Sequence, residues 1–319
     1  MIPNVTAPAS ARNVRSLVVF GEFFLDLVFY ELPSVPKMGE EVKTRSFAEF
    51  PGGGVATTAL VASRLGTSTA IITRIGRDAT SSPAWKTLIQ SRILVDACEL
   101  HSRLPTARSV CAAYDGDRMM ITYDAINHNL EMLLMRRAVQ RQLQHAKHVH
   151  FACALSPPRA WIAALRKLRA RGLTLSADIG WNPATIGSPQ LPFLLREFDF
   201  AFPNEMEARA MTGEKMIEKA AKKLAQWVRV PVIKLGRQGC IAVQHGRIVR
   251  VKSFSVSSVD ATGAGDAFNG GFLHAYLAGW SLEDCLRAGN VCGALATTRA
   301  GGSSAILMRN RLRGLMKSL

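Results

Sequence analysis

Residues 258–271 carry the clearest signs of chemistry in this sequence, because small residues there lead into a helix whose first turn holds an acid. Phe268 and Phe272 recur at helical spacing, so the second half of the stretch is predicted to be helical. Backbone N–H groups of residues 263–265 can approach a ligand closely, and together with the helix N-terminus they form a site for an anion. Asp266 would repel that anion unless it had a task, and the economical task is to take a proton from a hydroxyl group that attacks a phosphorus atom.

Other interpretations of this stretch compete with that one. Gly-Ala-Gly-Asp could be a tight turn whose acid suits the helix dipole. It could also belong to a dinucleotide-binding loop, but Phe268 stands where G-x-G-x-x-G requires its third glycine, and the stretch lies late in the chain. A Walker loop is excluded because no Gly-Lys-Ser or Gly-Lys-Thr follows. The motif alone favours phosphoryl chemistry only slightly, so the rest of the chain must decide.

Length and composition predict one globular domain that spans residues 1–319. The chain has 319 residues, 48% of them hydrophobic, which is enough for a well-filled core. No run of 18 apolar residues predicts a membrane-spanning helix, and residues 1–13 lack the apolar centre of a signal peptide. The six cysteines form no C-x-x-C pair and mostly lie in apolar surroundings, which is typical of reduced cysteines in a cytoplasmic protein.

The sequence is strongly basic, with a net charge of +16 from 40 Lys and Arg against 24 Asp and Glu. The basic residues are spread over the polar sides of several predicted helices, and no aromatic residues alternate with them as in a stacking platform for nucleic acid. Nucleic-acid binding is therefore a minor possibility. A basic surface would still attract phosphorylated ligands.

Strands and helices alternate along most of the chain. Buried strands are predicted at 14–20, 69–75, 148–154, 173–178, 198–202 and 230–235. Amphipathic helices between them, such as 57–65 and 158–171, predict an α/β fold in which helices sandwich a mostly parallel sheet. Segments of about 22–48 and 103–127 interrupt the alternation, and the second contains a hairpin around Asp-Gly-Asp at 115–117. We expect these two segments to form a small β lid.

Three histidines, His145, His148 and His150, lie close together at a helix-to-strand junction. No acid is near them in the sequence, so the pattern favours surface histidines over metal ligands.

Polar residues and glycines gather where the predicted strands end, which is the edge at which an open α/β sheet builds its site. The sequence places there Asp26, residues 52–54, Asn182, Asn204 with Glu207, Gly236 with Gly239, and residues 260–266.

This set resembles the ribokinase or PfkB-type carbohydrate and nucleoside kinases over nearly the whole chain, from Gly21 to Gly302. Val-Asp-Ala-Thr-Gly-Ala-Gly-Asp-Ala-Phe at 259–268 resembles that family's C-terminal signature. Pro-Gly-Gly-Gly at 51–54, ending in Arg-Leu-Gly at 64–66, is similar to its N-terminal signature, and Asn-Glu-Met-Glu at 204–207 is similar to its Asn-x-x-Glu motif.

The resemblance implies a catalytic centre for phosphoryl transfer. Asp266 would be the base that deprotonates the acceptor hydroxyl group, and Asn204 and Glu207 would orient the waters of Mg²⁺. The anion hole would be formed by Gly263, Ala264 and Gly265. ATP would lie along Asn182, Lys234, Gly236, Gly239 and Asn290. The sugar would be bound by Asp26, Gly53, Gly54 and Thr57 together with Asp266.

A monovalent cation, usually potassium in this family, would lie behind the anion hole, at Asp260, Thr262 and Gly301. The sequence also departs from the family pattern. Thr57 stands where an Asn is common, which puts a sugar contact in doubt, and Lys234 stands where many members have a small hydroxyl residue. Lys234 would contact a phosphate or extend to solvent. Residues 152–155, directly after Phe151, contain no acid to bind a sugar hydroxyl group, which disfavours ribose as the substrate.

The sequence thus predicts an ATP-dependent sugar kinase that acts on a primary hydroxyl group of a hexose, keto-sugar or sugar acid. Arg108 and Arg118 in the lid hairpin are candidates for recognising an acidic or phosphorylated sugar, although two solvated arginines are at least as consistent with the sequence. Two alternatives stay open: a nucleoside kinase of the same fold, and a catalytically idle member that binds a sugar or nucleic acid. A homodimer through the lid is a further possibility, since exposed strands often pair between subunits.

Overall fold

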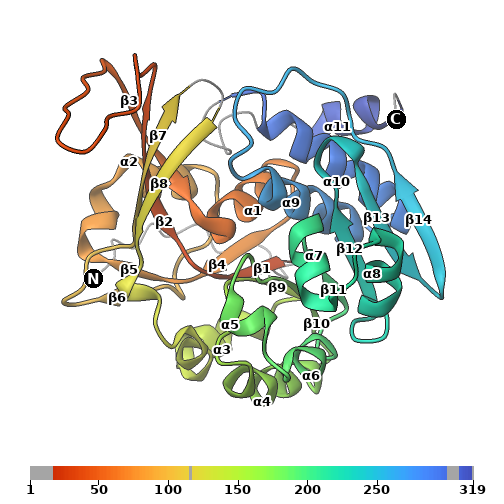
Figure 1. Cartoon of the computed structure of the whole chain (residues 1–319). Helices are drawn as coiled ribbons and strands as arrows, with labels where there is room; N and C mark the ends of the chain where they lie inside the picture. Colours follow the sequence, from red (N-terminus) through yellow and green to blue (C-terminus); the bar gives the residue numbers. More distant parts are fainter. Residues whose placement is uncertain (1–16, 115–116, 300–308, 318–319) are drawn as a thin grey trace.

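The computed structural model describes residues 17–114, 117–299 and 309–317, which build a central sheet with helices on both faces (Figure 1). The eight-stranded sheet has the order β14-β13-β12-β11-β10-β9-β1-β4. All neighbouring strands from β4 to β12 run parallel, and β13 and β14 continue the sheet antiparallel at one edge. The predicted α/β fold with a mostly parallel sheet is therefore confirmed.

The strands of this sheet are short and apolar, as expected for a parallel sheet covered on both faces. They are β1 (Leu17–Gly21), β4 (Thr69–Ile72), β9 (His148–Ala152), β10 (Thr174–Asp178), β11 (Phe200–Ala201), β12 (Val230–Lys234), β13 (Cys240–Gln244) and β14 (Arg247–Val251). Alternate side chains enter two separate cores. In β1, Leu17 and Val19 join one core, whereas Val18 and Phe20 join the other.

The helices divide between the same two cores. The first core contains side chains of α1 (Gly53–Arg64), α2 (Pro83–Gln90), α9 (Ala264–Leu277), α10 (Leu282–Ala296) and α11 (Arg309–Met316). The second contains side chains of α3 (Arg137–Leu143), α4 (Pro158–Arg169), α5 (Pro183–Ile186), α6 (Leu191–Leu195), α7 (Glu205–Thr212) and α8 (Ile217–Leu224). Within the described ranges, no helix combines the length and the apolar character that crossing a membrane requires.

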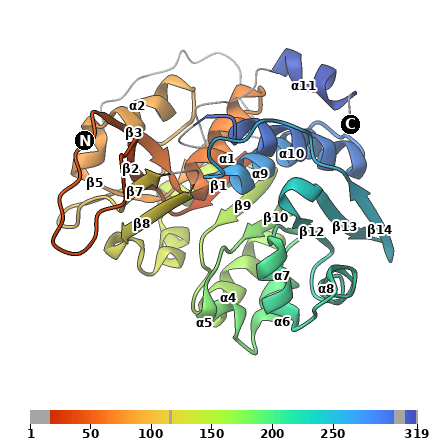
Figure 2. The ribbon, with the colours of Figure 1, turned by 45° about the horizontal axis from the view of Figure 1, so that its top comes forward.

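A second sheet of four strands stands beside the main sheet (Figure 2). Its order is β3-β2-β7-β8, built from β2 (Phe24–Tyr30), β3 (Ser46–Gly52), β7 (Arg108–Tyr114) and β8 (Asp117–Tyr123). The antiparallel pairing of β7 with β8 confirms the predicted hairpin, although its turn residues 115–116 lie outside the described ranges. A two-stranded sheet, β5 (Arg74–Gly76) with β6 (Glu99–His101), lies next to it. That the four-stranded sheet acts as a lid stays a prediction.

Two of the expectations were wrong in detail. His145 is exposed as expected, but His148 and His150 are fully buried because β9 is a central strand with both faces covered. Both rings share the Ser176 hydroxyl group, at 2.7 Å and 2.8 Å, and burial lowers the pKa of His148 to about 3 and of His150 to about 4. The second difference concerns the glycine segment: helix α1 begins at Gly53, so Gly53 and Gly54 form its first turn instead of preceding it.

Candidate active site

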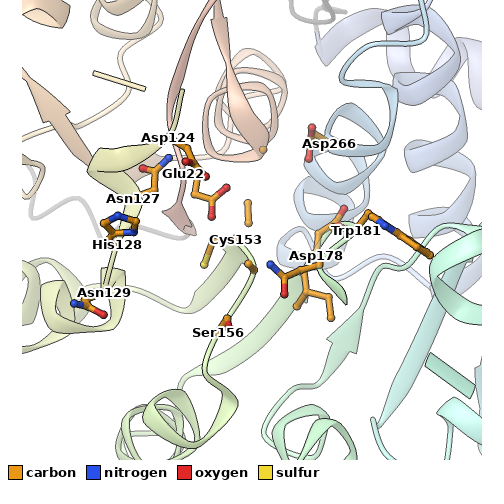
Figure 3. Close-up of a pocket in the computed structure, with 16 residues that line it drawn as sticks. Glu22, Asp124, Asn127, His128, Asn129, Cys153, Ser156, Asp178, Trp181 and Asp266 are labelled. Atoms are coloured by element: carbon orange, nitrogen blue, oxygen red, sulfur yellow. The ribbon is translucent and has the colours of Figure 1, made fainter. Parts of the chain in front are cut away.

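A cavity of about 760 Å³ opens where β1, β9 and β10 end (Figure 3). Its wall is completed by the first turns of α1 and α9 and by the segment that follows β8. The lining residues are Glu22, Gly54, Asp124, Asn127, His128, Asn129, Ala152, Cys153, Ala154, Ser156, Asp178, Ile179, Gly180, Trp181, Asn182 and Asp266. The cavity therefore lies at the carboxyl edge of the sheet, where the sequence predicted the site.

The glycine segment and the acid of the late motif meet in this cavity. A Cβ atom placed on Gly54 would lie 2.8 Å from Asp266 Oδ1 and 2.8 Å from the Cβ atom of Ala152. The Thr58 hydroxyl group donates a hydrogen bond to the backbone carbonyl of Asp266, at 3.1 Å, which ties α1 to the first turn of α9. Two stretches that lie far apart in the chain thus face the same space.

The first turn of α9 has the backbone form that an anion site needs. Gly263 caps the helix in the left-handed conformation, with φ at 69°, which glycine adopts without strain. The carbonyl of Gly263 accepts the first bond of the helix, from Ala267 N at 2.8 Å. The N–H groups of Gly265 and Asp266 therefore belong to the turn that has no partners inside a helix, and they can bind an anion, whereas the Ala264 N–H group donates to the Ala261 carbonyl at 3.3 Å.

A buried ion pair lies directly behind this turn. Lys234 Nζ is 2.5 Å from Asp178 Oδ2, and the two side chains are only 13% and 11% exposed. Asn269 Nδ2 donates to the same carboxylate oxygen at 2.7 Å. A Cβ atom on Gly265 would lie 3.1 Å from Lys234 Nζ, so the ammonium group packs against the predicted anion hole. Lys234 does not extend to solvent, which was one of the two expectations for it.

The ionisable groups of this centre shift one another's pKa values. Burial raises the pKa of Asp266 to about 7, and the charge of Asp178 adds to the effect, whereas Lys234 acts against it. Burial would also raise the pKa of Asp178, but the Lys234 ammonium and its hydrogen bond hold it below the ordinary value. Burial favours neutral Lys234, yet the nearby carboxylates raise its pKa overall. An Asp266 carboxyl group whose pKa lies near neutral pH is suited to accept a proton.

Asp26 and the remaining glycines lie beside the cavity. Asp26 is in β2, and a Cβ atom on Gly52 would lie 2.1 Å from its Oδ2 atom, so the carboxylate packs against the glycine backbone. Its charge contributes to the raised pKa of Asp266. Gly53 has a φ of +80°, and a Cβ atom there would lie 2.3 Å from the carbonyl oxygen of Glu22. Thr57 is buried in α1, with 4% of its surface exposed.

The predicted ATP-contacting residues belong to different elements of the fold. Asn182 lines the cavity and caps α5 by accepting a hydrogen bond from Thr185 N at 2.9 Å. Gly236 begins the short 3-10 helix η4 (Gly236–Gln238), and Gly239 follows it. Asn290 is buried inside α10, where its amide group is occupied. It donates to the carbonyl groups of Val251 and Lys252 at 3.2 Å and 2.9 Å.

The predicted magnesium residues Asn204 and Glu207 form a capping box at the start of α7. Asn204 Oδ1 accepts from Glu207 N at 2.9 Å, and Glu207 Oε2 accepts from Asn204 N at 2.8 Å. Glu207 is nevertheless part of the charged centre, because burial and the charge of Asp178 raise its pKa. Three carboxylates, Asp178, Glu207 and Asp266, thus surround a single lysine, an excess of negative charge that suits a hydrated cation.

The predicted monovalent-cation residues are only partly within the described ranges. Asp260 Oδ1 accepts hydrogen bonds from the N–H and hydroxyl groups of Thr262, at 2.8 Å and 2.5 Å. Asp260 N donates to the Thr297 carbonyl at 3.0 Å, which joins this loop to the end of α10. Gly301 lies outside the described residues. In the part of the chain that the structure describes, no three His, Cys, Asp or Glu side chains are grouped to ligate a metal directly.

Some residues of the cavity were missed in the sequence. Asp178 directly follows apolar residues of its strand, which is the same signal that singled out Asp26. It was nevertheless predicted only as the end of that strand. Glu22 stands one residue beyond β1, so its position in the sequence favoured a role in the site equally well. Asp124 and Asn127 have no comparable signal, because they follow a strand of the second sheet and reach the cavity only through the tertiary fold.

Gly54→Ala tests the contact between α1 and α9. The added methyl group would lie 2.8 Å from both Asp266 Oδ1 and Ala152 Cβ, so the carboxylate must move. We expect kcat/KM to fall by about 10²-fold, because displacing a reacting group by about 1 Å has this effect. Gly314→Ala in α11 is the matched control, since nothing lies within 4 Å of its added Cβ atom. Equal activity of the two variants in steady-state assays would contradict the proximity of Gly54 to the reacting atoms.

Comparisons with known proteins agree with this geometry. Residues 14–308 match the model of the pfkB family carbohydrate kinase. A ribokinase of Haemophilus influenzae is 28% identical over 92% of this chain and 96% of its own length, and fructokinase-2 of Oryza sativa subsp. japonica is 28% identical over 94% and 93%. An Escherichia coli protein solved in complex with ATP and Mg²⁺ has the same fold, with a TM-score of 0.81 and 22% identity over 95% of this chain and 99% of its own. The chain belongs to the PfkB family of carbohydrate kinases.

Proposed function

We propose that this protein transfers the γ-phosphoryl group of ATP to a primary hydroxyl group of a small carbohydrate, a hexose or a keto-sugar. The observation that carries the proposal is the meeting of Gly54 and Asp266 in one cavity, beside the amide groups that open α9. The curated relatives named ribokinase and fructokinase support a sugar as acceptor, and the Escherichia coli structure with ATP and Mg²⁺ supports the donor and its metal.

In this mechanism Asp266 accepts the proton of the attacking hydroxyl group as the new bond to phosphorus forms. The N–H groups of Gly265 and its neighbours hold the oxygens of the transferring group, and Lys234, which packs against Gly265, adds positive charge behind them. Mg²⁺, when bound, would offset the charge of the nucleotide phosphates. Glu207 and Asn204 would hold its waters, in keeping with the excess of carboxylates near Lys234.

The charges of the cavity argue against the sugar-acid option. Arg108, a candidate for recognising an acidic sugar, forms an ion pair with Asp78 instead. The side chain of Arg118 lies outside the described residues. Among the sixteen lining residues there is no lysine or arginine, whereas four carboxylates are present. An anionic sugar would meet repulsion in this cavity unless a cation came with it.

An acceptor panel tests the proposal directly. Purified protein is incubated with MgATP and single acceptors (hexoses, keto-sugars, ribose, sugar acids and nucleosides), and ADP release and phosphorylated products are measured. We expect product with at least one hexose or keto-sugar. Product from nucleosides alone would replace the proposal with a nucleoside kinase of the same fold. A chain that binds sugars but yields no product would be a catalytically idle member.

A potassium ion behind the anion hole is part of the proposal. The Asp260 loop is joined to the carbonyl end of α10 at Thr297, so carbonyl and carboxylate oxygens lie close together there. A bound cation would stiffen this loop, which leads directly into the anion hole. We expect activity in potassium chloride to exceed that in tetramethylammonium chloride at equal ionic strength. Equal rates in both salts would remove this ion from the proposal.

The four-stranded sheet supports a homodimer through the lid. Its outer strand β8 exposes Met119, Met120 and Ile121, the last with 76% of its surface accessible. Such an apolar outer strand is a site where a second chain can pair. Sedimentation velocity should show a dimer that Ile121→Lys converts to a monomer. A wild-type monomer at micromolar concentrations would refute this part of the proposal.

The cysteines support a reducing location, and the cytoplasm is the compartment that we propose. All six are buried in the structure as thiols: Cys98, Cys111, Cys153, Cys240, Cys285 and Cys292. Proteins of oxidising compartments more often pair their cysteines. Fractionation of the native cells should recover the protein with the cytoplasmic marker, and recovery with an extracytoplasmic marker would contradict this assignment.

A further inference from the structure

One end of the cavity is built from residues that phosphoryl transfer does not need. Glu22 follows β1, and Asp124 precedes the 3-10 helix η2 (Ala125–Asn127), whose Asn127 N–H donates to the Asp124 carbonyl at 2.8 Å. Figure 3 shows Glu22, Asp124 and Asn127 gathered on one side of the cavity, with Asp266, Asp178 and Trp181 on the other. We call the three gathered residues the acidic end of the cavity.

The acidic end lacks a cation of its own. Asp178, across the cavity, is balanced by Lys234, but in the described part of the chain no lysine or arginine makes an ion pair with Glu22 or Asp124. Glu22 accepts a hydrogen bond from the backbone of Ala154, and Asp124 is close enough for its charge to disfavour ionised Glu22. Two carboxylates that repel each other inside a cavity are stabilised by a positive charge placed between them.

The amide group of Asn127 adds an independent sign of a ligand. Both Nδ2 and Oδ1 are buried without a hydrogen-bond partner, and Asn127 lines the cavity. A buried polar group without a partner is costly, so such groups in a cavity wall are commonly satisfied by what the cavity binds. A carboxamide donates and accepts, and a sugar hydroxyl group can do both in return. This end of the cavity is therefore equipped to meet a hydroxyl group and a cation side by side.

We propose that the acceptor is an amino sugar, whose protonated amine lies between Glu22 and Asp124 while Asn127 binds a neighbouring hydroxyl group. This proposal rests on the proposed kinase function and names the class of its substrate. A neutral sugar would leave the two carboxylates facing each other, and an anionic sugar would add a third negative charge. The amine instead meets both carboxylates, and the far end of the same molecule can present its hydroxyl group to Asp266.

The titration of Glu22 is consistent with this geometry. Burial raises the pKa of Glu22 to about 7, the Ala154 N–H group acts against it, and Asp124 raises it further. The other titratable groups that line the cavity are His128, Cys153, Asp178 and Asp266, none of which is a permanent cation. A protonated amine next to Glu22 would lower its pKa and ionise it, so binding of the amine releases protons near neutral pH.

Matched pairs of acceptors separate the effect of the amine from that of the sugar. The probes are D-glucose with D-glucosamine, D-fructose with 1-amino-1-deoxy-D-fructose, and D-gluconate as the anionic member. Phosphorylation is followed with MgATP, and binding is followed by calorimetry in two buffers of different ionisation enthalpy. We expect an amino member to exceed its neutral parent by about 10- to 100-fold in kcat/KM, the effect of one hydrogen bond to a charged group.

Glu22→Gln is the variant that tests the carboxylate, because it keeps the shape of the side chain. It should remove most of the preference for the amino sugar, measured as the ratio of kcat/KM for the amino and neutral members of a pair, and abolish the proton release. Glu283→Gln is the matched control, since Glu283 is exposed in α10 and pairs only with Arg287 on the same helix. It should retain the preference and the proton release.

The outcomes distinguish the two proposals. Phosphorylation of neutral sugars in preference to every amino sugar would overturn the amine-binding role and leave the sugar kinase intact. Binding of an amino sugar that depends on Glu22, without any phosphorylated product, would uphold the acidic end and refute the kinase function. Equal preference for amino sugars in Glu22→Gln and in wild type would also overturn the proposal, because Glu22 would then not meet the amine.

Discussion

Asp266→Asn is expected to lower kcat by about 10²- to 10⁴-fold, the range that a positioned general base contributes. Asparagine keeps the size of the side chain and the helix that begins at Ala264, but it cannot take the proton of the attacking hydroxyl group. The backbone amides of the anion hole remain, so ATP binding should be retained. Turnover is measured by ADP release with the best acceptor, and ATP affinity is measured by calorimetry.

The pH dependence of wild-type activity provides a second test of the role of Asp266. The pKa of Asp266 is raised to about 7, chiefly by burial, and only the ionised form can accept a proton. Activity should therefore be present above neutral pH and fall as the pH drops through 7, approaching about tenfold per pH unit. The residual activity of Asp266→Asn should lack this acidic limb. Undiminished turnover in Asp266→Asn would show that Asp266 is not the catalytic base.

Lys234→Met is expected to reduce both stability and turnover. The substitution leaves Asp178 buried without its partner at 2.5 Å, and breaking such a pair typically costs about 3–5 kcal/mol in the free energy of unfolding. It also removes the positive charge behind Gly265, and the loss of one stabilising group of this kind lowers kcat by about 10²- to 10³-fold. Urea unfolding and steady-state kinetics measure the two effects separately.

A double variant separates structure from catalysis at this pair. Asp178→Asn with Lys234→Met removes both charges, so no unpaired ion remains, and the amide oxygen of the introduced side chain can still accept from Asn269 Nδ2. We expect the double variant to recover most of the stability that Lys234→Met loses, as replacing a whole buried pair is often nearly neutral. Its kcat should stay low. Recovery of turnover together with stability would show that Lys234 acts only as the partner of Asp178.

Local patterns in the sequence were sufficient for the architecture. The apolar strand 148–154 and the amphipathic helix 158–171 were predictable because burial on two faces and burial on one face leave different periods in the sequence. The glycine before α9 also carried information, since Gly263 adopts a left-handed conformation that few other residues adopt. His148 and His150 were misjudged because a polar residue in a central strand reveals nothing of its partner, here Ser176 on the neighbouring strand.

Lys234 is a residue whose contacts could not be predicted from local sequence patterns. Its position at the end of an apolar strand was predictable, but the direction of its side chain depended on Asp178, which lies 56 residues away in the chain. Asn290 is a second case, because the sequence gave no sign that its amide nitrogen donates to the carbonyl groups of Val251 and Lys252. In both cases the partner is brought close by folding, and spacing along the chain carries no record of it.

The amino-acid order alone determined the parallel sheet, the edge of that sheet at which the site lies, and the acid at the start of α9. Each of these features depends on neighbours within a few residues. The tertiary structure decided which acids share a cavity: Gly54 packs beside Asp266, Lys234 neutralises Asp178, and Glu22 faces Asp124 without a lysine or arginine among the residues that line the cavity. Charge interactions depend on distance in space and on exclusion of water, and only the packed chain sets either quantity.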